Sequence, residues 1–433
     1  MIESAAKIQR CLASEFAAHA QRLSNGRTPP IKRSNSGELG SLGEALVRSD
    51  LPVISAESAL QQPEWPDHQH VRMVREILAD RPPLVYADDV HKLGSHLSRV
   101  AAGELLVVQT GDCAEDPAEC TPGYVARKIA LLDMLAGALK MATGKPVLRV
   151  GRIAGQFAKP RSRPAERVGG VDLPVYRGHL VNSPEPDPVL RRPDPERLLE
   201  CYDAANAAME YLRLRNGERP EASVWTSHEA LLLDYELPML RRTEAGRWLL
   251  TSTHWPWIGN RTNQPDGAHA ALLATIDNPI ACKVGPDMTP DALVALCERL
   301  DPFRVPGRLT LISRMGAGKA AERLPPLVAA VREAGHRAGW LTDPMHGNTV
   351  SGPDGLKTRF VETVVREILE FRSAVSEGRG VAAGLHLETT PDEVTECVAD
   401  ESMIGHVGDK YTSFCDPRLN PKQAIEVVSA WRR

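Results

Sequence analysis

The chain has 433 residues, of which 42% are hydrophobic and 25% charged, and its 52 basic and 56 acidic side chains leave a net charge of −4. This balance excludes a mostly disordered or fibrous chain, and the absence of a basic field argues against nucleic-acid binding. No apolar run approaches the roughly 18 residues of a membrane span, and no signal-peptide pattern opens the chain. We therefore expect a cytoplasmic protein, whose eight scattered cysteines stay reduced.

The first part of the chain, residues 1–100, is predicted to be a helical N-terminal extension. Residues 3–23 have the pattern of an amphipathic helix, and residues 57–102 again carry helical periodicity. Between them, residues 24–42 are rich in Gly, Pro, Ser and Asn, which indicates a flexible segment.

Residues 101–433 then alternate between strand-like and helix-like stretches. The apolar runs are LLVVQTGDC, VLRVGRIAG, SVWTSHEA, WLLTSTHW, PIACKVGP, LTLISRMG, GWLTDPMHG and VAAGLHLE. Predicted helices cover residues 123–142, 195–215, 267–276, 289–300, 319–335, 357–376 and 420–432, with a weaker helix between the third and fourth runs. Eight such units predict a catalytic (β/α)8 TIM barrel. A doubly wound sheet is the alternative, but TGDCAED is not its Gly-rich phosphate fingerprint.

Strongly polar residues close every apolar run. In chain order they are Asp112 and Cys113, Arg152, His228 and Glu229, His254, Lys283, Arg314, His346 and Glu388. Buried parallel strands consist mainly of Val, Ile and Leu, so this repetition is unusual. Because the carboxyl ends of barrel strands converge on the face where active sites lie, we expect one ring of cations, carboxylates, imidazoles and a thiol.

One part of this ring can bind a metal ion. Cys113, His346 and Glu388, together with Asp416 in the loop after the eighth run, offer one sulfur, one nitrogen and two oxygen donors. Such a mixed set suits Mn²⁺, Fe²⁺, Co²⁺ or Zn²⁺ better than Mg²⁺ or Ca²⁺.

The other part of the ring is cationic and predicts an anionic substrate. Its members are Arg152, Lys159, Arg161, Arg163, Arg261, Lys283 and Arg314. Arg163 is compatible with a solvated surface position, whereas Arg152, Lys283 and Arg314 lie in or beside apolar runs, where a cation without an anion is costly. Phosphate or carboxylate groups are the natural ligands of such side chains.

The ordered motifs of the chain resemble the class II (plant-type) 3-deoxy-D-arabino-heptulosonate 7-phosphate (DAHP) synthases over roughly residues 60–433. The segments that carry the resemblance are QTGDCAE (109–115), GRIAGQFAKPRS (151–162), LPVYRG (173–178), TSHEALLLDYE (226–236), WIGNRTNQPDGAH (257–269), KVGP (283–286), LISRMG (311–316), TDPMHGNT (342–349), HLETTPDEVTEC (386–397) and CDPRLNP (415–421).

The resemblance implies a transferase that condenses phosphoenolpyruvate with erythrose 4-phosphate, giving DAHP and phosphate for a shikimate-type or specialised-metabolite pathway. It implies Cys113, His346, Glu388 and Asp416 as ligands of a divalent metal, foremost Mn²⁺, with Co²⁺, Zn²⁺ or Fe²⁺ as alternatives. The substrate-binding residues it implies are Arg152, Lys159, Arg177, His179, Trp257, Asn260, Arg261, Lys283 and Arg314. Lys283, His228 and Glu229 are candidate catalytic proton shuttles. A homodimer or higher homo-oligomer, and a chorismate mutase partner, are further expectations.

Several residues depart from the family pattern near the substrate. Asn260 stands where the family has Glu, Asn263 where it has Arg, and His179 where it has Asp. Ser183 and Thr342 are smaller departures. Three interpretations follow: neutral drift, a different aldehyde substrate such as another aldose phosphate or an amino-sugar phosphate, or loss of the ordinary activity. A catalytically silent barrel that serves as a binding scaffold is the rival from another class.

Overall fold

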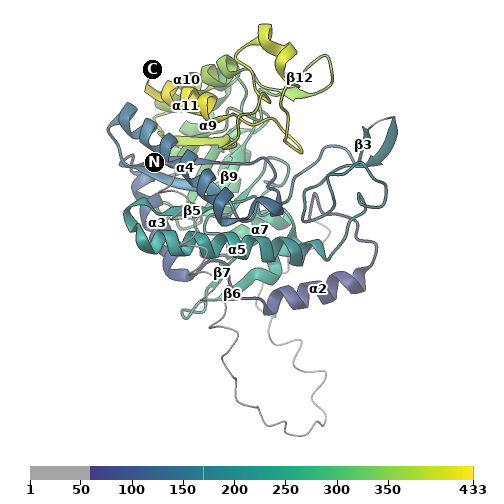
Figure 1. Cartoon of the computed structure of the whole chain (residues 1–433). Coiled ribbons are helices and arrows are strands. Elements are labelled where there is room, and N and C mark those ends of the chain that lie inside the picture. Colours follow the sequence, from purple (N-terminus) through teal and green to yellow (C-terminus); the bar gives the residue numbers. More distant parts are fainter. Residues whose placement is uncertain (1–58, 169, 433) are drawn as a thin grey trace, which may run out of the picture. The chain divides into compact units, whose positions relative to one another are not determined.

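A computed structural model describes residues 59–168 and 170–432, all within the unit Pro52–Arg433 (Figure 1). The helix predicted over residues 3–23 and the flexible segment predicted over residues 24–42 lie outside the described residues. Within those ranges, no helix combines the length and apolar character that crossing a bilayer requires.

The core is a parallel sheet of eight strands. Their order is β5-β2-β1-β14-β11-β10-β9-β8. The strands are β1 (Leu106–Gly111), β2 (Val147–Arg152), β5 (Val224–Thr226), β8 (Trp257–Ile258), β9 (Ile280–Val284), β10 (Leu309–Ser313), β11 (Gly339–Thr342) and β14 (Val381–Glu388). The two outer strands also meet: the Trp257 amide donates to His228 O at 3.1 Å, and the Ala230 amide donates to Trp257 O at 2.9 Å. The sheet therefore closes on itself, and the predicted (β/α)8 barrel is confirmed.

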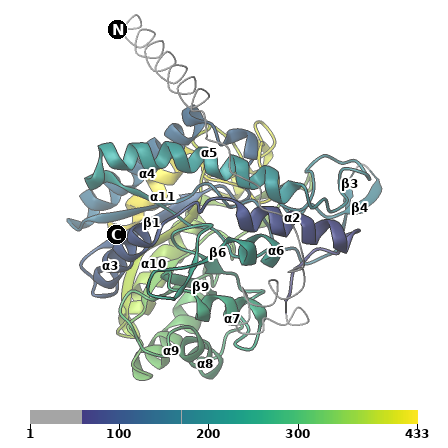
Figure 2. The same cartoon turned by 90° about the horizontal axis from the view of Figure 1, so that it is seen from below.

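Helices surround this barrel. They are α4 (Pro122–Thr143), α5 (Arg197–Glu218), α6 (Leu233–Glu236), α7 (Ala268–Thr275), α8 (Pro290–Leu300), α9 (Ala320–Glu333), α10 (Val361–Glu377) and α11 (Pro421–Ser429). Helices α4 and α5 cover one side, and α8 and α9 cover another (Figures 1 and 2). The ends of α4 illustrate the local signals: Thr121 caps its first turn, Pro122 opens it, and Gly144 ends it in a left-handed conformation.

Within the described part of the chain, two helices precede the first strand, α2 (His68–Asp80) and α3 (Ala87–Ala101). The buried face of α3, with Leu93, Leu97 and Val100, belongs to the same core cluster as Leu105 and Leu148, which lie where β1 and β2 begin. Helix α3 thus packs at the amino-terminal end of the barrel and leaves the opposite end open for a site.

The prediction for the fourth unit was wrong. The run that begins with WLL forms β7 (Trp248–Leu250), which pairs antiparallel with β6 (Leu240–Arg242) beside the one-turn helix α6. The barrel strand is β8, seven residues further on, so His254 precedes the strand and does not end it. Its Nδ1 accepts from the Thr226 amide at 3.1 Å. A short apolar run has the same pattern in a hairpin and in a barrel strand, so its partner decides between them.

The remaining elements are short. Two hairpins stand at the carboxyl-terminal end of the barrel, β3 (Ala165–Val168) with β4 (Val171–Pro174), and β12 (Val350–Ser351) with β13 (Lys357–Thr358). The 3₁₀ turns are η2 (Pro117–Glu119), η3 (Pro220–Ala222), η4 (Leu237–Met239), η5 (Glu401–His406) and η6 (Ala430–Arg432).

Candidate active site

A cavity of about 590 Å³ opens at the carboxyl ends of the strands. Of the residues predicted as site residues, those that line it are Cys113, Arg152, Lys159, Glu229, Trp257, Asn260, Arg261, Lys283, Arg314, His346 and Asp416. They come from seven strand ends and the loop before α11, so the fold brings together residues that are up to about 300 positions apart in sequence. The gathering of polar strand ends at one face is thereby observed.

A cluster of metal-type donors lies at one wall of the cavity. Atoms of Cys113, Glu388 and Asp416 lie within 4.8 Å of one another, and all three residues are buried. Glu388 lies directly behind the lining, with its Oε1 3.2 Å from Nε2 of His346. The ammonium of Lys159 sits among them, 2.5 Å from Asp416 Oδ2 and in contact with Cys113 Sγ. The cluster therefore already holds a positive charge, and its thiol, imidazole and carboxylate donors fit a borderline divalent ion.

The pKa values of these groups follow from their neighbours. Burial alone would raise the pKa of Glu388 and Asp416. The charges of His346, Arg359 and Lys159 nevertheless hold the pKa of Glu388 well below its ordinary value, and the charges of Lys159, Arg359 and Lys357 do the same for Asp416. Burial raises the pKa of the Cys113 thiol. A cation in the cluster would favour the thiolate and offset that effect.

Three cations stand beside the donor cluster. Two of them lie against the ring of Trp257: Lys283 Nζ is 4.5 Å from the ring centroid, and Arg152 Cζ is 5.8 Å from it. Lys283 donates to Asp343 Oδ2 at 2.7 Å, and Arg314 donates to the His346 carbonyl at 3.1 Å. Burial lowers the pKa of Lys283, and the positive charge of Arg152 lowers it further. The carboxylate of Asp343 raises it but does not compensate for these two effects. Charges held this close in a buried wall favour binding of an anion.

Glu229 is the one lining carboxyl with an unpartnered oxygen among the described residues. Its Oε1 is buried and has no hydrogen-bond partner there. A Cβ on Gly259 would stand 2.2 Å from that oxygen, so a larger residue there would displace the carboxyl from its present position. Burial raises the pKa of Glu229, despite the nearby Lys283 and Lys159. The backbone amide of Glu229 donates to Gln156 Oε1 at 3.0 Å, which fixes the start of this loop.

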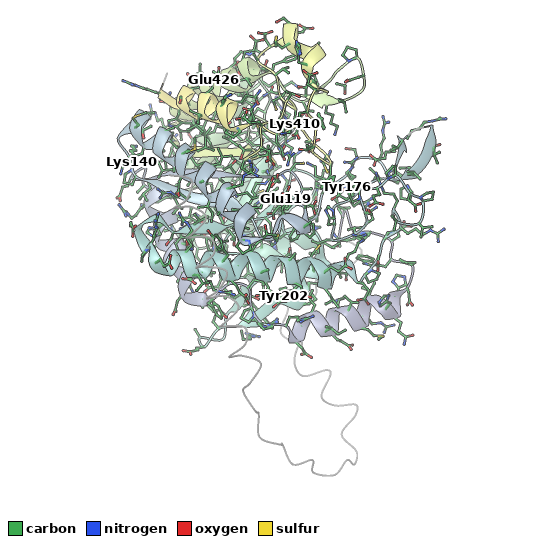
Figure 3. All side chains as sticks on the ribbon, in the orientation of Figure 1. Glu119, Lys140, Tyr176, Tyr202, Lys410 and Glu426 are labelled. Atoms are coloured by element: carbon green, nitrogen blue, oxygen red, sulfur yellow. The ribbon has the colours of Figure 1, made fainter. Side chains whose placement is uncertain are left out.

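Besides Glu388, three predicted residues lie outside the lining. His228 points to Glu236, with Nε2 2.9 Å from Oε1, and Arg177 donates to the Gln61 carbonyl at 3.4 Å. His179 contacts the hydroxyl of Tyr176, which is labelled in Figure 3, at 2.7 Å. The substitution at His179 therefore changes the packing beside the site and not the cavity wall itself.

The outer rim contains residues that the sequence did not single out, Gln156, Glu166, Arg167 and Lys357. Arg161 and Arg163 join them; Arg163 is exposed, as expected, but it also lines the cavity. A signal was present in the stretch RSRPAERV, where three arginines follow the second strand within seven residues. The sequence did not predict the hairpin β3–β4, so it could not show that these arginines lie at the mouth of the cavity.

A closed parallel barrel whose cation-lined mouth also holds a metal-type donor cluster defines an enzyme of the (β/α)8 class with an anionic substrate. The chain belongs to the class-II DAHP synthetase family, whose model matches residues 52–219 and 214–430. The predicted family resemblance is thereby confirmed, and the chain is an enzyme of the transferase type.

Three relatives share most of their length with this chain. A probable phospho-2-dehydro-3-deoxyheptonate aldolase of Pseudomonas fluorescens is 56% identical over 378 residues, covering 86% of this chain and 94% of the relative. Phospho-2-dehydro-3-deoxyheptonate aldolases of Streptomyces coelicolor and Mycolicibacterium smegmatis are 38% and 36% identical, covering 86% and 88% of this chain and 94% of each relative. A truncated 3-deoxy-D-arabino-heptulosonate 7-phosphate synthase from Thermotoga maritima aligns structurally with a TM-score of 0.37 and 14% identity, over 75% of this chain and 84% of its own.

Proposed function

We propose that the chain condenses phosphoenolpyruvate with erythrose 4-phosphate to give DAHP and inorganic phosphate. One observation carries the proposal beyond family membership: nine cationic side chains but only three carboxylates line one cavity, beside the metal-type donor cluster. Two phosphates and one carboxylate are the anions that the two substrates would bring. A cavity built for a single small anion would need far fewer cations.

Phosphoenolpyruvate fits the inner wall. Arg152 and Arg314 can each form paired hydrogen bonds with its carboxylate or phosphate, and Lys283 adds a point charge beside them. The substrate would thereby compensate the repulsion among these cations. Fixing its C3 next to the aldehyde of the second substrate removes much of the entropic barrier, by up to about 7–11 kcal/mol in well-oriented systems.

Cys113, His346, Glu388 and Asp416 would hold the divalent metal, and among the ions that such a mixed donor set accepts we propose Mn²⁺. When bound, such an ion supplies Lewis-acid polarisation of a carbonyl oxygen.

Proton handling falls to Glu229 and Lys283. Carbon–carbon bond formation from C3 leaves C2 electron-deficient, water adds there with loss of a proton, and phosphate departs by C–O cleavage to leave the ketone. The unpartnered Glu229 oxygen can take and return a proton more readily than an ordinary carboxylate because burial raises its pKa. Lys283 can do so because burial lowers its pKa. His228 faces Glu236 and not the cavity, so we assign it no proton transfer.

The amino-sugar alternative is disfavoured by the rim. An ammonium group would need a free carboxylate, but Glu166 pairs with Arg161 and Arg191, and Asp416 pairs with Lys159 and Lys357. Only Glu229 remains, next to the cationic wall. A neutral aldose phosphate therefore suits the cavity better.

The test is consumption of phosphoenolpyruvate by the purified chain with Mn²⁺ and a panel of aldose and amino-aldose phosphates, with mass-spectrometric identification of the product. We expect DAHP from erythrose 4-phosphate, and loss of turnover after chelation and in Cys113→Ala. Arg372→Ala, on the outer helix α10, serves as the control. Turnover with an amino-aldose phosphate alone would replace the proposed aldehyde, and no turnover with any aldehyde would favour the scaffold.

A further inference from the structure

The candidate metal donors come from segments that are held in place to different degrees. Cys113 follows β1, Glu388 ends β14, and the parallel pairing of these strands aligns Gly111 with Glu388. Asp416 instead lies in the irregular stretch between η5 and α11. The backbone of that stretch pairs with the barrel at one bridge, between Thr389 and Leu419, and the Arg359 side chain donates to the Pro417 carbonyl. The geometry of the cluster therefore depends on what else fixes the loop of Asp416.

A buried carboxylate accepts hydrogen bonds from residues on both sides of Asp416 in this loop. Glu396 is fully buried and accepts hydrogen bonds from the backbone amides of Thr412 at 3.0 Å and Ser413 at 2.8 Å. It also accepts from the amide of Arg418 at 2.8 Å. Asp416 lies between these anchored residues.

The side chain of Arg418 connects this anchor to the strand end that carries Cys113. Its Nε and one terminal nitrogen donate to the two oxygens of Glu396 at 3.0 and 2.8 Å. Its other terminal nitrogen donates to Asp112 Oδ1 at 2.6 Å, and Asp112 immediately precedes Cys113. Asp112 is 1% exposed and Arg418 6% exposed, so water cannot easily replace these bonds.

We propose that Arg418 is a positioning residue of the metal centre, which sets the distance between Cys113 and Asp416 through Asp112 and Glu396. This inference rests on the metal site of the proposed function. Arg418 touches neither ligand. The planar guanidinium alone spans both carboxylates, because an ammonium on a flexible stem satisfies one at a time. Outer partners of this kind typically change metal affinity 10–100-fold when they are removed.

The experiment titrates Mn²⁺ alone into the metal-free chain, followed by calorimetry and by the electron paramagnetic resonance signal of free Mn²⁺. We expect Arg418→Met to weaken Mn²⁺ binding by about 10–100-fold, and Arg418→Lys to fall between it and the unmodified chain. The matched control is Arg127→Met, which removes another Arg–Asp ion pair, with Asp392 at 2.7 Å, and should leave Mn²⁺ affinity unchanged. At saturating Mn²⁺, kcat of the Arg418 variants should recover while the weakened affinity persists.

Each outcome decides the matter. Mn²⁺ affinity within two-fold of the control in both Arg418 variants would overturn the role of Arg418 and leave the proposed function standing. Absence of Mn²⁺ binding in the unmodified chain would instead refute the metal site, and Arg418 with it. If Arg418→Met does not fold, as circular dichroism would reveal, Arg418→Lys alone decides, since it retains the charge. A lowered melting temperature with unchanged Mn²⁺ affinity would indicate a purely structural role and would also overturn the inference.

Discussion

At the scale of single residues, the site depends on keeping like charges close together. Arg152 and Lys283 are both at most 4% exposed, and both lie against the ring of Trp257. The ring's electron-rich faces attract each cation, and Glu388 and Asp343 provide one counter-charge each. The compensation is incomplete, because burial together with the charge of Arg152 still lowers the pKa of Lys283. An anionic substrate therefore gains binding energy by relieving the repulsion between these two cations.

Glu229→Gln is the sharpest test of proton transfer. It removes the titrating group but keeps the shape, so we expect kcat to fall by about 10²–10⁴-fold with little change in phosphoenolpyruvate binding. Because burial raises the pKa of Glu229, the corresponding limb of the pH–rate profile should also disappear. Steady-state rates against pH and equilibrium binding of phosphoenolpyruvate measure the two effects.

The control for this variant is Glu119→Gln. The pKa of Glu119, which is labelled in Figure 3, is raised to about 7, mainly by burial, but this residue does not line the cavity. Its kcat and pH profile should match those of the unmodified chain. An unchanged pH limb in Glu229→Gln would exclude Glu229 as the proton carrier.

At the scale of elements, α10 fixes two loops of the site from behind. Glu367 accepts hydrogen bonds from the amides of Met315 and Gly316, which follow Arg314, at 3.1 and 3.0 Å. It also accepts from the side chain of Asn348, two residues after His346, at 2.6 Å. The helix thus links the loop of a substrate cation to the loop of a metal-type donor.

This link predicts a pH dependence of stability. Burial raises the pKa of Glu367 from 4.5 to about 7. The pKa of Glu367 is thus higher in the folded protein than in the unfolded chain, so the protonated carboxyl stabilises the fold. This contribution, about 3 kcal/mol in total, is complete below pH 4.5 and is lost as the pH rises through 7. Glu367→Gln lacks this titrating group. Between pH 5 and pH 8 the free energy of unfolding of the unmodified chain should therefore fall relative to that of Glu367→Gln. Urea unfolding at both pH values measures this; parallel pH profiles would contradict it.

The hairpin β3–β4 is a second element with a testable role. Arg191, 4% exposed, contacts Glu166 Oε1 at 2.5 Å and donates to the Pro174 carbonyl at 3.2 Å, so it holds both strands of the hairpin. Arg191→Met should loosen the arginine-bearing rim, raising KM for the aldose phosphate several-fold while the affinity for phosphoenolpyruvate stays constant. Arg192→Met, one residue on, is the control; equal loss of both affinities would indicate general unfolding.

The sequence predicted some of these elements but not others. Strand ends such as those at Arg152, Lys283 and Glu388 could be predicted, because a polar residue closing an apolar run is a local signal and barrel closure then brings such ends together. The hairpins β3–β4 and β6–β7 could not, because their strands have only three or four residues and depend on pairing partners. The place of His179 could not be predicted either: it directly follows the motif LPVYRG, but its side chain contacts the Tyr176 hydroxyl and is not part of the cavity lining.

At the scale of the whole molecule, function depends on closing the barrel between β1 and β14. The two strands pair over five positions, from Val107 with Gly384 to Gly111 with Glu388, and this pairing sets Cys113 beside Glu388. Gly384 permits the approach: its φ is +144°, and a Cβ there would stand 2.0 Å from the carbonyl oxygen of Val107. Backbone atoms cannot yield as a flexible side chain can, so any larger residue must separate the strands.

Gly384→Ala should therefore destabilise the protein by about 3 kcal/mol or more and weaken Mn²⁺ binding, since Cys113 and Glu388 would move apart. Gly94→Ala is the matched comparison, because Gly94 lies inside α3 with nothing within 4 Å of the added Cβ. Alanine is the better helix former, so that variant should gain about 1 kcal/mol and bind Mn²⁺ normally. Urea unfolding and Mn²⁺ titration of both variants decide the point. Equal stability of the two would show that strand closure tolerates a side chain at position 384, and the donor geometry would then need another origin.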